Sequence, residues 1–300
     1  MSPSIPKLIL LGTGTPAPSL NRQSSGIIVD LGEQVLVFDH GPGAHHRLLE
    51  AGYRASDMTH LFLTHHHYDH IADVPRLLLT RWDHGDPAQG DPKVFGPPPL
   101  ERIMASFFGP DGAFGPDLEA RTQSPASLAV YRARGHDGPR RKLTLDTREL
   151  APGETIDGPG FAVRTGPARH VQPYLESIAY RIEVGERTVV YSGDNGGVFE
   201  PFIDFARGCD VLIHMNHFLS GTELTEDYRR MSGSHLDVAE TARRAGAETL
   251  VLTHLLPQLD APGVKERMIA EMTAVYDGRI IVGEDLMSVP LEPAARSIAD

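Results

Sequence analysis

Residues 64 to 70 read THHHYDH and place four histidines and one aspartate within seven positions. Imidazole nitrogens and carboxylate oxygens are the donors that bind zinc and similar divalent ions in proteins. If the apolar strand HLFLTH continues through the motif, His65 and His67 leave the same face and can converge on one ion. Asp69 and His70 follow the expected end of the strand, where a turn can direct them at a second ion. A histidine-rich surface turn is the alternative, but a solvated loop does not need so many ligand-type side chains.

A complete site needs further donors, since zinc prefers about four ligands and a catalytic zinc keeps one position for water. Three candidates each stand at the end of a predicted strand: His170 ends GFAVRTGPARH, Asp194 ends RTVVYSGD and His254 ends TLVLTH. Alone, each is more typical of a cap or a hydrogen-bonded group, but together with the motif they favour a metal site. Asp194 is the expected bridge, because the two oxygens of a carboxylate can bind two cations about 3.5 to 4 Å apart.

Short strands and helices must position these residues. Apolar strands are predicted at KLILLGTG, SGIIVDLG, EQVLVFDHG and HLFLTH, with the helix-like HHRLLEAG before the last of them. IADVPRLLLTRW is predicted to be helical, whereas residues 83–140 are rich in Gly and Pro and are predicted to be irregular. In the second half, strands alternate with the helices VFEPFIDFARG, DVAETARRAG and VKERMIAEMTAVYDG. This alternation predicts layers of helix packed on largely buried sheet.

Composition narrows the classes of protein. With 300 residues and 40% hydrophobic content, we expect one domain spanning residues 1–300. The net charge of -12 makes a polynucleotide a disfavoured partner, though not an excluded one. Cys209 is the only cysteine and is expected to be a small buried core residue. The apolar run LILL is too short for a secretory signal, and no stretch reaches the roughly 18 to 20 apolar residues of a membrane span. We therefore expect a soluble, cytoplasmic protein without a membrane partner.

The order H-x-H-x-D-H, single His, S-G-D and T-H resembles the metallo-β-lactamase superfamily of αββα hydrolases. The stretches LGTGTP, VFDHGPG, LTHHHYDH, VFGPPPLERI, YSGDN, DVLIH and LVLTH resemble the branch that holds ribonuclease Z and arylsulfatase-type enzymes, over residues 7 to about 256. This resemblance implies an α/β fold, a four-layer αββα sandwich of two mixed sheets flanked by helices. It also implies two divalent metal ions, one held by His65, His67 and His170 and the second by Asp69, His70 and His254, with Asp194 bridging. Zinc is the expected ion, with manganese and iron as alternatives.

The expected chemistry is the activation of a shared water by the two ions for attack on an electrophilic centre. Asp69 is predicted to be catalytic as well, because it could accept a hydrogen bond from that water. Asp39 in VFDHG is predicted either to orient a ligand histidine through its second ring nitrogen or to cap a turn.

Two features depart from ribonuclease Z. The long arm that grips tRNA in that family would lie between His170 and Asp194, where this chain has only 23 residues, predicted to form a hairpin. The family tends to carry His-Glu after the strand DVLIH, but here Met215 takes the place of that proton-delivering glutamate. His235 in GSHLD resembles the later catalytic histidine. The proton-delivery pair is therefore half lost or rebuilt with His217, which favours a leaving group that departs without a proton.

These features favour a hydrolase that acts on a small molecule and breaks an ester, sulfate ester, lactone or activated aryl halide. Asn216 and His217 are predicted to contact the substrate, with ordinary loop polarity as the alternative. Residues 83–140 and Trp82 are predicted to form a lid or wall for it, with core packing or a dimer contact as the alternative. A homodimer is expected only by analogy with related proteins.

Two other classes remain open. One is a ribonuclease Z-like phosphodiesterase, which would need a basic patch near the cleft, built for example from Arg132, Arg134, Arg140, Arg141 and Lys142. The other comprises mononuclear iron oxygenases and metal-free binding modules. The second set of ligands, Asp69, His70 and His254, argues against both members of this last class.

Overall fold

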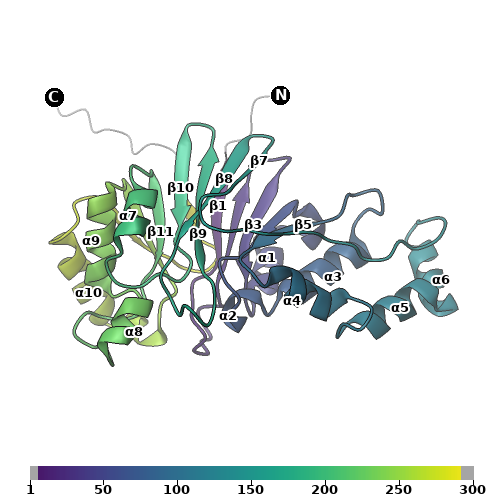
Figure 1. Ribbon diagram of the computed structural model, residues 1–300, viewed down its shortest axis with the longest axis horizontal. Coiled ribbons are helices and arrows are strands. Elements are labelled where there is room, and N and C mark those ends of the chain that lie inside the picture. Colours follow the sequence, from purple (N-terminus) through teal and green to yellow (C-terminus); the bar gives the residue numbers. More distant parts are fainter. Residues whose placement is uncertain (1–5, 292–300) are drawn as a thin grey trace.

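The computed structural model describes residues 6–291, and its strands form two seven-stranded mixed sheets (Figure 1). The first sheet has the order β14 (Ser288–Val289), β1 (Lys7–Gly12), β2 (Gly26–Asp30), β3 (Val35–His40), β4 (His60–Phe62), β5 (Lys93–Gly96), β6 (Asp146–Glu149). The second has the order β13 (Arg279–Val282), β12 (Thr249–Thr253), β11 (Val211–Met215), β10 (Arg187–Tyr191), β9 (Ile178–Val184), β8 (Phe161–Pro167), β7 (Thr155–Gly158). In each sheet an antiparallel part continues into parallel strands.

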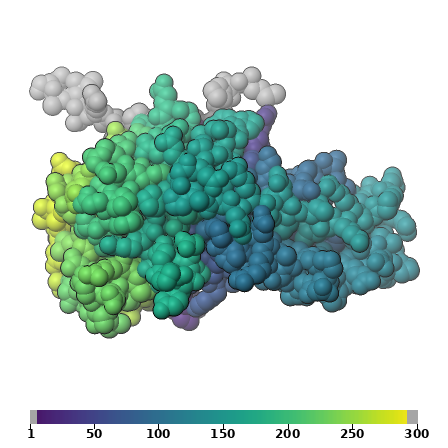
Figure 2. Space-filling model, viewed as in Figure 1, coloured from purple at the N-terminus to yellow at the C-terminus, as the bar shows by residue number. Residues whose placement is uncertain are grey.

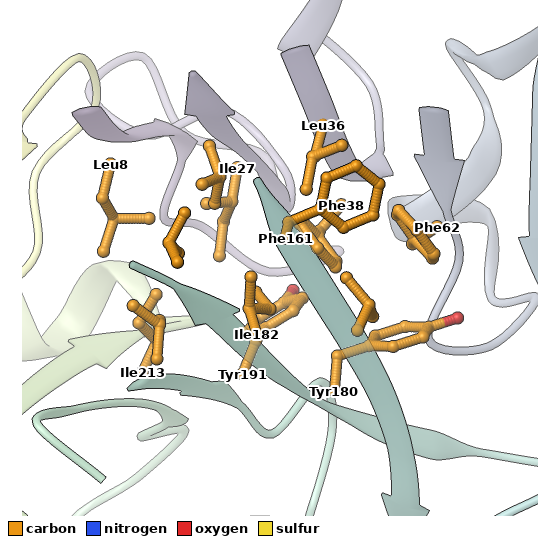
Figure 3. Close-up of a cluster of buried hydrophobic side chains, with 14 of the residues drawn as sticks. Leu8, Ile27, Leu36, Phe38, Phe62, Phe161, Tyr180, Ile182, Tyr191 and Ile213 are labelled. Carbon is orange, nitrogen blue, oxygen red and sulfur yellow. The ribbon is translucent and has the colours of Figure 1, made fainter. Parts of the chain in front are cut away.

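The inner faces of the two sheets pack against each other and form the central core. Leu8 and Phe38 of the first sheet share one buried cluster with Tyr180, Ile182 and Ile213 of the second (Figure 3). Alternate residues of the same strands pack outward, so that Leu8 and Leu10 face the other sheet while Ile9 and Leu11 face helices. Burial on both faces explains why LILL is apolar throughout instead of alternating with polar residues.

Helices cover both outer faces and complete the predicted αββα sandwich, which is confirmed. The first sheet is covered by α1 (Ala44–Glu50), α3 (Val74–His84) and α4 (Leu100–Phe108). The second is covered by α7 (Glu200–Ala206), α9 (His235–Ala245) and α10 (Val264–Thr273). Two short helices, α2 (Tyr68–Ile71) and α8 (Glu226–Met231), lie in the loops at one end of the sheets (Figure 1). Cys209 is buried in the core beside α7 and α9.

Residues 83–140 are more regular than the sequence predicts. They contain β5, α4, α5 (Gly115–Gln123) and α6 (Pro125–Ala133). Prolines occupy the first turns of α5 and α6, where the missing N–H would lack a helical partner in any case, so they start these helices instead of interrupting them. Figure 1 shows α5 and α6 projecting sideways from the sandwich. Among residues 6–291, no helix is long and apolar enough to cross a membrane.

Candidate metal centre

The motif THHHYDH spans the loop after β4 and the start of α2. Strand β4 ends at Phe62, three residues before His65, so the two histidines do not converge by strand alternation as expected. The loop brings them together instead, and α2 begins at Tyr68 and carries Asp69 and His70 on its single turn. His170, Asp194 and His254 follow the ends of β8, β10 and β12 and meet the loop at the same edge of the sandwich.

All seven predicted ligands come together in two groups of donor atoms. In each group, the donor atoms lie within 4.8 Å of one another. The first group holds His65, His67, His170 and Asp194, and the second holds Asp69, His70 and His254. Six of these side chains are buried, and His67 is partly exposed.

The spacing in the first group is that of donors arranged around a cation. Nδ1 of His67 lies 3.1 Å from Nε2 of His65 and 3.1 Å from Nε2 of His170. Oδ2 of Asp194 lies 3.5 Å from Nε2 of His170 and 3.8 Å from Nε2 of His65. Ligands at about 2.0 to 2.1 Å from a tetrahedral zinc would stand about 3.4 Å from each other, so these separations fit such an ion.

The second group has similar spacing and shares Asp194 with the first. Oδ2 of Asp69 lies 3.5 Å from Nε2 of His70 and 3.2 Å from Nε2 of His254. Asp194 reaches this group as well, with Oδ1 3.4 Å from Nε2 of His70 and Oδ2 3.4 Å from Nε2 of His254. The carboxylate of Asp194 therefore lies between the two groups, where the sequence places the bridge.

Unsatisfied buried atoms support the fit of metal ions to this site. Nε2 of His70, Oδ1 of Asp69 and Oδ1 of Asp194 are buried and lack hydrogen-bond partners. Leaving polar atoms buried without partners is costly, and bound cations would satisfy the His70 and Asp194 atoms, while a bound water would satisfy Oδ1 of Asp69. The donor set of imidazoles and carboxylates also matches divalent ions.

Neighbouring charges lower the pKa of Asp194 and raise the pKa of His70. Burial alone would raise the pKa of Asp194, but His254 and His70 hold it well below its usual range. Burial alone would lower the pKa of His70, but Asp194, Asp39 and Asp69 raise it well above its usual range. Without a cation, His70 therefore holds a proton among three carboxylates. A metal ion would have to displace that proton, so metal affinity should rise with pH.

In four of the ligand histidines, Nδ1 contacts a neighbouring group, which holds the ring in place. Nδ1 of His70 donates to Oδ2 of Asp39 at 2.8 Å, and Nδ1 of His170 donates to the carbonyl of Met231 at 2.6 Å. Nδ1 of His254 lies 3.1 Å from Nδ1 of His217. His65 bonds through Nδ1 to the hydroxyl of Thr64, which in turn donates to Asp39. These contacts aim all four Nε2 atoms at the site.

Three of the groups that hold the ligand histidines in place are not predicted from the sequence. Thr64 precedes the motif directly, and its hydroxyl and backbone N–H both donate to Asp39. Tyr191 donates its hydroxyl to Oδ2 of Asp39 at 2.8 Å from the opposite sheet. The Met231 carbonyl belongs to the backbone, and every residue has such a carbonyl, so the sequence cannot indicate it. Tyr191 could have been suspected, because it directly precedes the S-G-D of Asp194 and ends an otherwise aliphatic strand.

Three other predicted site residues direct their side chains at groups other than the metal ligands. His235 already uses both ring nitrogens, accepting from the N–H of Ser220 at 2.9 Å and bonding Glu271 at 2.8 Å, so its role in proton delivery stays a prediction. Asn216 is buried and directs its amide at the sulfur of Met268. Trp82 donates to the carbonyl of Arg141 and lines a small pocket that contains no metal ligand, so it offers the centre no wall or lid.

Comparisons with known proteins come from sequence and from structure. The model of the β-lactamase superfamily domain matches residues 34–255. Ribonuclease Z of Mycobacterium sp. (strain KMS) is 32% identical, with 96% of each chain covered. Ribonuclease Z of Mycobacterium bovis (strain BCG / Pasteur 1173P2) is 30% identical, with 96% of this chain and 99% of the relative covered.

Two solved structures share the fold. The metallo-β-lactamase fold protein YhfI from Bacillus subtilis has a TM-score of 0.71 at 21% identity, with coverage of 96% and 100%. The short form of human tRNase Z has a TM-score of 0.68 at 19% identity, with coverage of 95% and 99%.

The ribonuclease Z relatives contradict the prediction of a small-molecule hydrolase and of nucleic acid as an unlikely partner. That prediction rests on the net charge of the whole chain and on the absence of a long arm between His170 and Asp194. Net charge is an average over the surface and does not report a local cluster of cations. The replacement of the glutamate by Met215 was also a weak guide, because one missing acid does not define the bond that is cleaved.

Proposed function

Because the chain belongs to the metallo-β-lactamase superfamily and to its ribonuclease Z branch, we propose that it is an endoribonuclease that hydrolyses phosphodiester bonds in RNA. Its membership makes it a metal-dependent hydrolase. The observation that carries the proposal is the pair of adjoining donor groups that share Asp194. A pair of neighbouring cation sites suits an in-line displacement at phosphorus, where attacking and leaving oxygens both need stabilisation.

The proposed ligands are His65, His67 and His170 for one ion and Asp69, His70 and His254 for the other, with Asp194 shared between them. Zinc is the proposed ion for this nitrogen and oxygen set, with manganese and iron as alternatives. When bound, two such ions would lower the pKa of a bound water and polarise a phosphoryl oxygen.

Asp69 is proposed to orient the attacking water. Its Oδ2 faces His254 and His70, while its buried Oδ1 has no hydrogen-bond partner. Burial would raise the pKa of Asp69, but His70 and His254 lower it, so the carboxylate is ionised and can only accept. A water next to Oδ1 would therefore direct a proton at Asp69 and a lone pair away from it.

His217 is proposed to contact the substrate. Its Nδ1 faces His254, which leaves Nε2 to carry a proton and to donate a hydrogen bond to a substrate oxygen. Burial, followed by the neighbouring His254, lowers the pKa of His217 to about 4, so the ring is neutral at pH 7. A neutral imidazole donates a hydrogen bond but is a poor source of a full proton. Met215 is buried and apolar, so it cannot supply that proton either.

The test is cleavage of a tRNA precursor with a 3′ trailer by protein loaded with zinc or manganese, followed on a gel, with Asp194→Ala as the control. The proposal expects a defined cleavage product that is lost in the control and on chelation. A chromogenic aryl sulfate, aryl ester and lactone are assayed in parallel. Metal-loaded protein that leaves RNA intact but turns over one of these substrates would overturn the proposal.

A further inference from the structure

The segment 125–144, which comprises α6 and the loop after it, has a charge opposite to that of the rest of the chain. It holds five of the 28 lysine and arginine residues but only one of the 40 acidic residues, so its net charge is +4 while the remainder carries -16. The cations are Arg132, Arg134, Arg140, Arg141 and Lys142. We call this segment the cationic arm.

The cationic arm projects from the body of the protein. Figures 1 and 2 show α5 and α6 at one end of the long axis, beyond the first sheet. Four of its five cations are exposed, and Arg140 is partly buried. The metal ligands lie at the junction of the two sheets, and none of them lines either pocket of this end of the molecule. The arm is therefore a surface separate from the metal centre.

A network of arginines around Asp83 at the end of α3 holds the arm in place. Arg121, Arg134 and Arg140 all pair with this one carboxylate, and Arg121 also pairs with Asp117, which leaves the cluster with one uncompensated positive charge. Arg140 also stacks on Trp82 with its guanidinium carbon 4.1 Å from the ring centre, and on Tyr131 at 5.3 Å. These contacts hold Arg134 and Arg140 against the end of α3, whereas Arg132 and Lys142 take no part in them.

The remaining cations of the arm are available to an external anion. Among residues 6–291, neither Arg132 nor Lys142 has an ion-pair partner, and both are exposed. Arg141 pairs with Asp91 at 2.6 Å, but both side chains are open to solvent, and exposed pairs of this kind exchange partners at little cost. Tyr131, Arg141 and Lys142 line the same pocket, so these cations lie close together.

We propose that the cationic arm binds the sugar-phosphate backbone of an RNA substrate at a distance from the metal centre. This inference rests on the proposed function, and it names where the substrate is held while the metal centre cleaves it. Guanidinium and ammonium groups on a projecting segment match a row of phosphates, and attraction to such a row is strong and salt-dependent. The segment carries +4 in a chain whose other residues sum to -16, so its local charge favours an approaching polyanion.

On the side of the arm that faces Trp82, the contact is to phosphates and not to bases. The pocket beside Trp82 has a volume of about 50 Å³, which holds only a few water molecules. Arg140 already covers the Trp82 ring at 4.1 Å, so this aromatic face is not free for base stacking. Binding should therefore tolerate changes of sequence and depend on the number of phosphates in reach.

The experiment combines the charge reversals Arg132→Glu and Lys142→Glu in one protein, because neither residue takes part in the network around Asp83. The matched control combines Arg54→Glu and Arg164→Glu, two exposed arginines on other elements with no ion pair among the described residues, which give the same change in net charge. Both proteins and the unaltered chain are titrated with fluorescent mature tRNA, which needs no cleavage, and KM is measured on the tRNA precursor. Turnover of bis(p-nitrophenyl) phosphate reports on the metal centre alone.

The expected result is a Kd for tRNA and a KM for precursor raised about 10-fold in the arm variant, with turnover of the small diester unchanged. The slope of log Kd against log salt should fall by about 1.5, as for two lost phosphate contacts. The control pair should change neither slope nor KM by more than about 2-fold. Lys142→Arg and Arg132→Lys together should restore tight binding.

Three results would overturn the inference. One is precursor cleavage with the same KM in the arm variant and the unaltered chain, which would leave the proposed function standing. Another is an equal loss of affinity in the control pair, which would assign the effect to net charge. The third is displacement of tRNA by polyglutamate of equal charge as effectively as by RNA, which would assign the arm to an acidic protein partner. A chain that binds tRNA through the arm yet leaves precursor intact would support the inference and overturn the proposed function.

Discussion

Oδ2 of Asp39 lies 2.8 Å from Nδ1 of His70, although the two residues are 31 positions apart in the sequence. The same oxygen accepts the hydroxyl of Tyr191 at 2.8 Å and that of Thr64 at 2.9 Å. A single carboxylate oxygen thus connects β3 of one sheet and β10 of the other to a ligand on α2. Asp39 also has a positive φ of 54°, a conformation that costs energy for most residues but is tolerated by Asp and Asn.

Replacing Asp39 by Asn should weaken metal binding without changing the fold. Asn has the same shape and tolerates the same backbone conformation, but it loses the charge and would place an N–H group against three donors if its amide occupied the position of Oδ2. We expect the affinity for metal to fall by about 10- to 100-fold. Competition with a fluorescent chelator measures the affinity, and circular dichroism checks the fold. A variant that binds both ions as tightly as the unaltered chain would show that Asp39 only caps its turn.

His217→Ala should lower the affinity for one of the two ions more than for the other. His217 holds the ring of His254 through the 3.1 Å contact between their Nδ1 atoms, and His254 belongs to the second donor group only. We expect about a 10-fold loss at that site, seen as a biphasic chelator titration with one step unchanged. A uniform shift of both steps would contradict the assignment of His254 to the second group.

His235→Ala gives a contrasting expectation, because this ring is bonded to Ser220 and Glu271 and not to a ligand. We expect the variant to keep both ions and to lose about 1 to 3 kcal/mol of unfolding free energy from the unsatisfied partners, measured by urea denaturation. Turnover should be affected only through stability. If turnover at a temperature where the variant is fully folded falls by orders of magnitude while both ions remain bound, His235 delivers a proton as the sequence predicts.

The sequence predicts the fold well because the two sheets are buried on both faces. The aliphatic runs LILL, VLVF and TLVLT indicate strands that are buried on both faces, and glycines follow most of them. Residues 83–140 are predicted less well, because prolines 116 and 125 signal breaks in a single sequence although each stands in the first turn of a helix. Only the flanking residues and the tertiary packing distinguish these two uses of proline.

The clustering of the seven candidate ligands could be predicted because four of them share one short motif and the other three closely follow strands. Their supporting contacts could not, since a backbone carbonyl such as that of Met231 carries no residue type. The prediction of a small-molecule substrate is wrong because charge summed over the chain does not report where the cations lie. Charge that is concentrated on 20 residues of one projecting segment disappears in that sum.

Bound ions should stabilise the folded chain. They bind the native site and have no comparable site in the unfolded chain, so saturation at 100 times Kd should add about 2.7 kcal/mol per site. We expect Tm to rise on addition of zinc or manganese and to fall on chelation, and Asp194→Ala to lose most of the shift because both donor groups lose their shared oxygen. An equal shift in this variant would mean that the ions bind elsewhere.

His60 should make the protein less stable in mild acid. This histidine lies in β4 with its ring 5.1 Å from that of Phe161, and burial lowers its pKa to about 4. The unfolded chain binds a proton at His60 below about pH 6.5, whereas the folded chain binds it only near pH 4. Stability is therefore complete above pH 6.5 and falls as the pH drops from 6.5 to 4, by at most about 3 kcal/mol for this group.

His60→Phe removes that titration and keeps an aromatic ring in place, at the cost of one hydrogen bond to Thr59. The difference in unfolding free energy between pH 7 and pH 5, measured with urea, should be smaller in this variant than in the unaltered chain. Phe95→Leu is the control, because it weakens the same aromatic cluster without removing an ionisable group, and its curve should run parallel to that of the unaltered chain. A pH dependence that His60→Phe leaves unchanged would place the acid sensitivity on other buried histidines, such as His214.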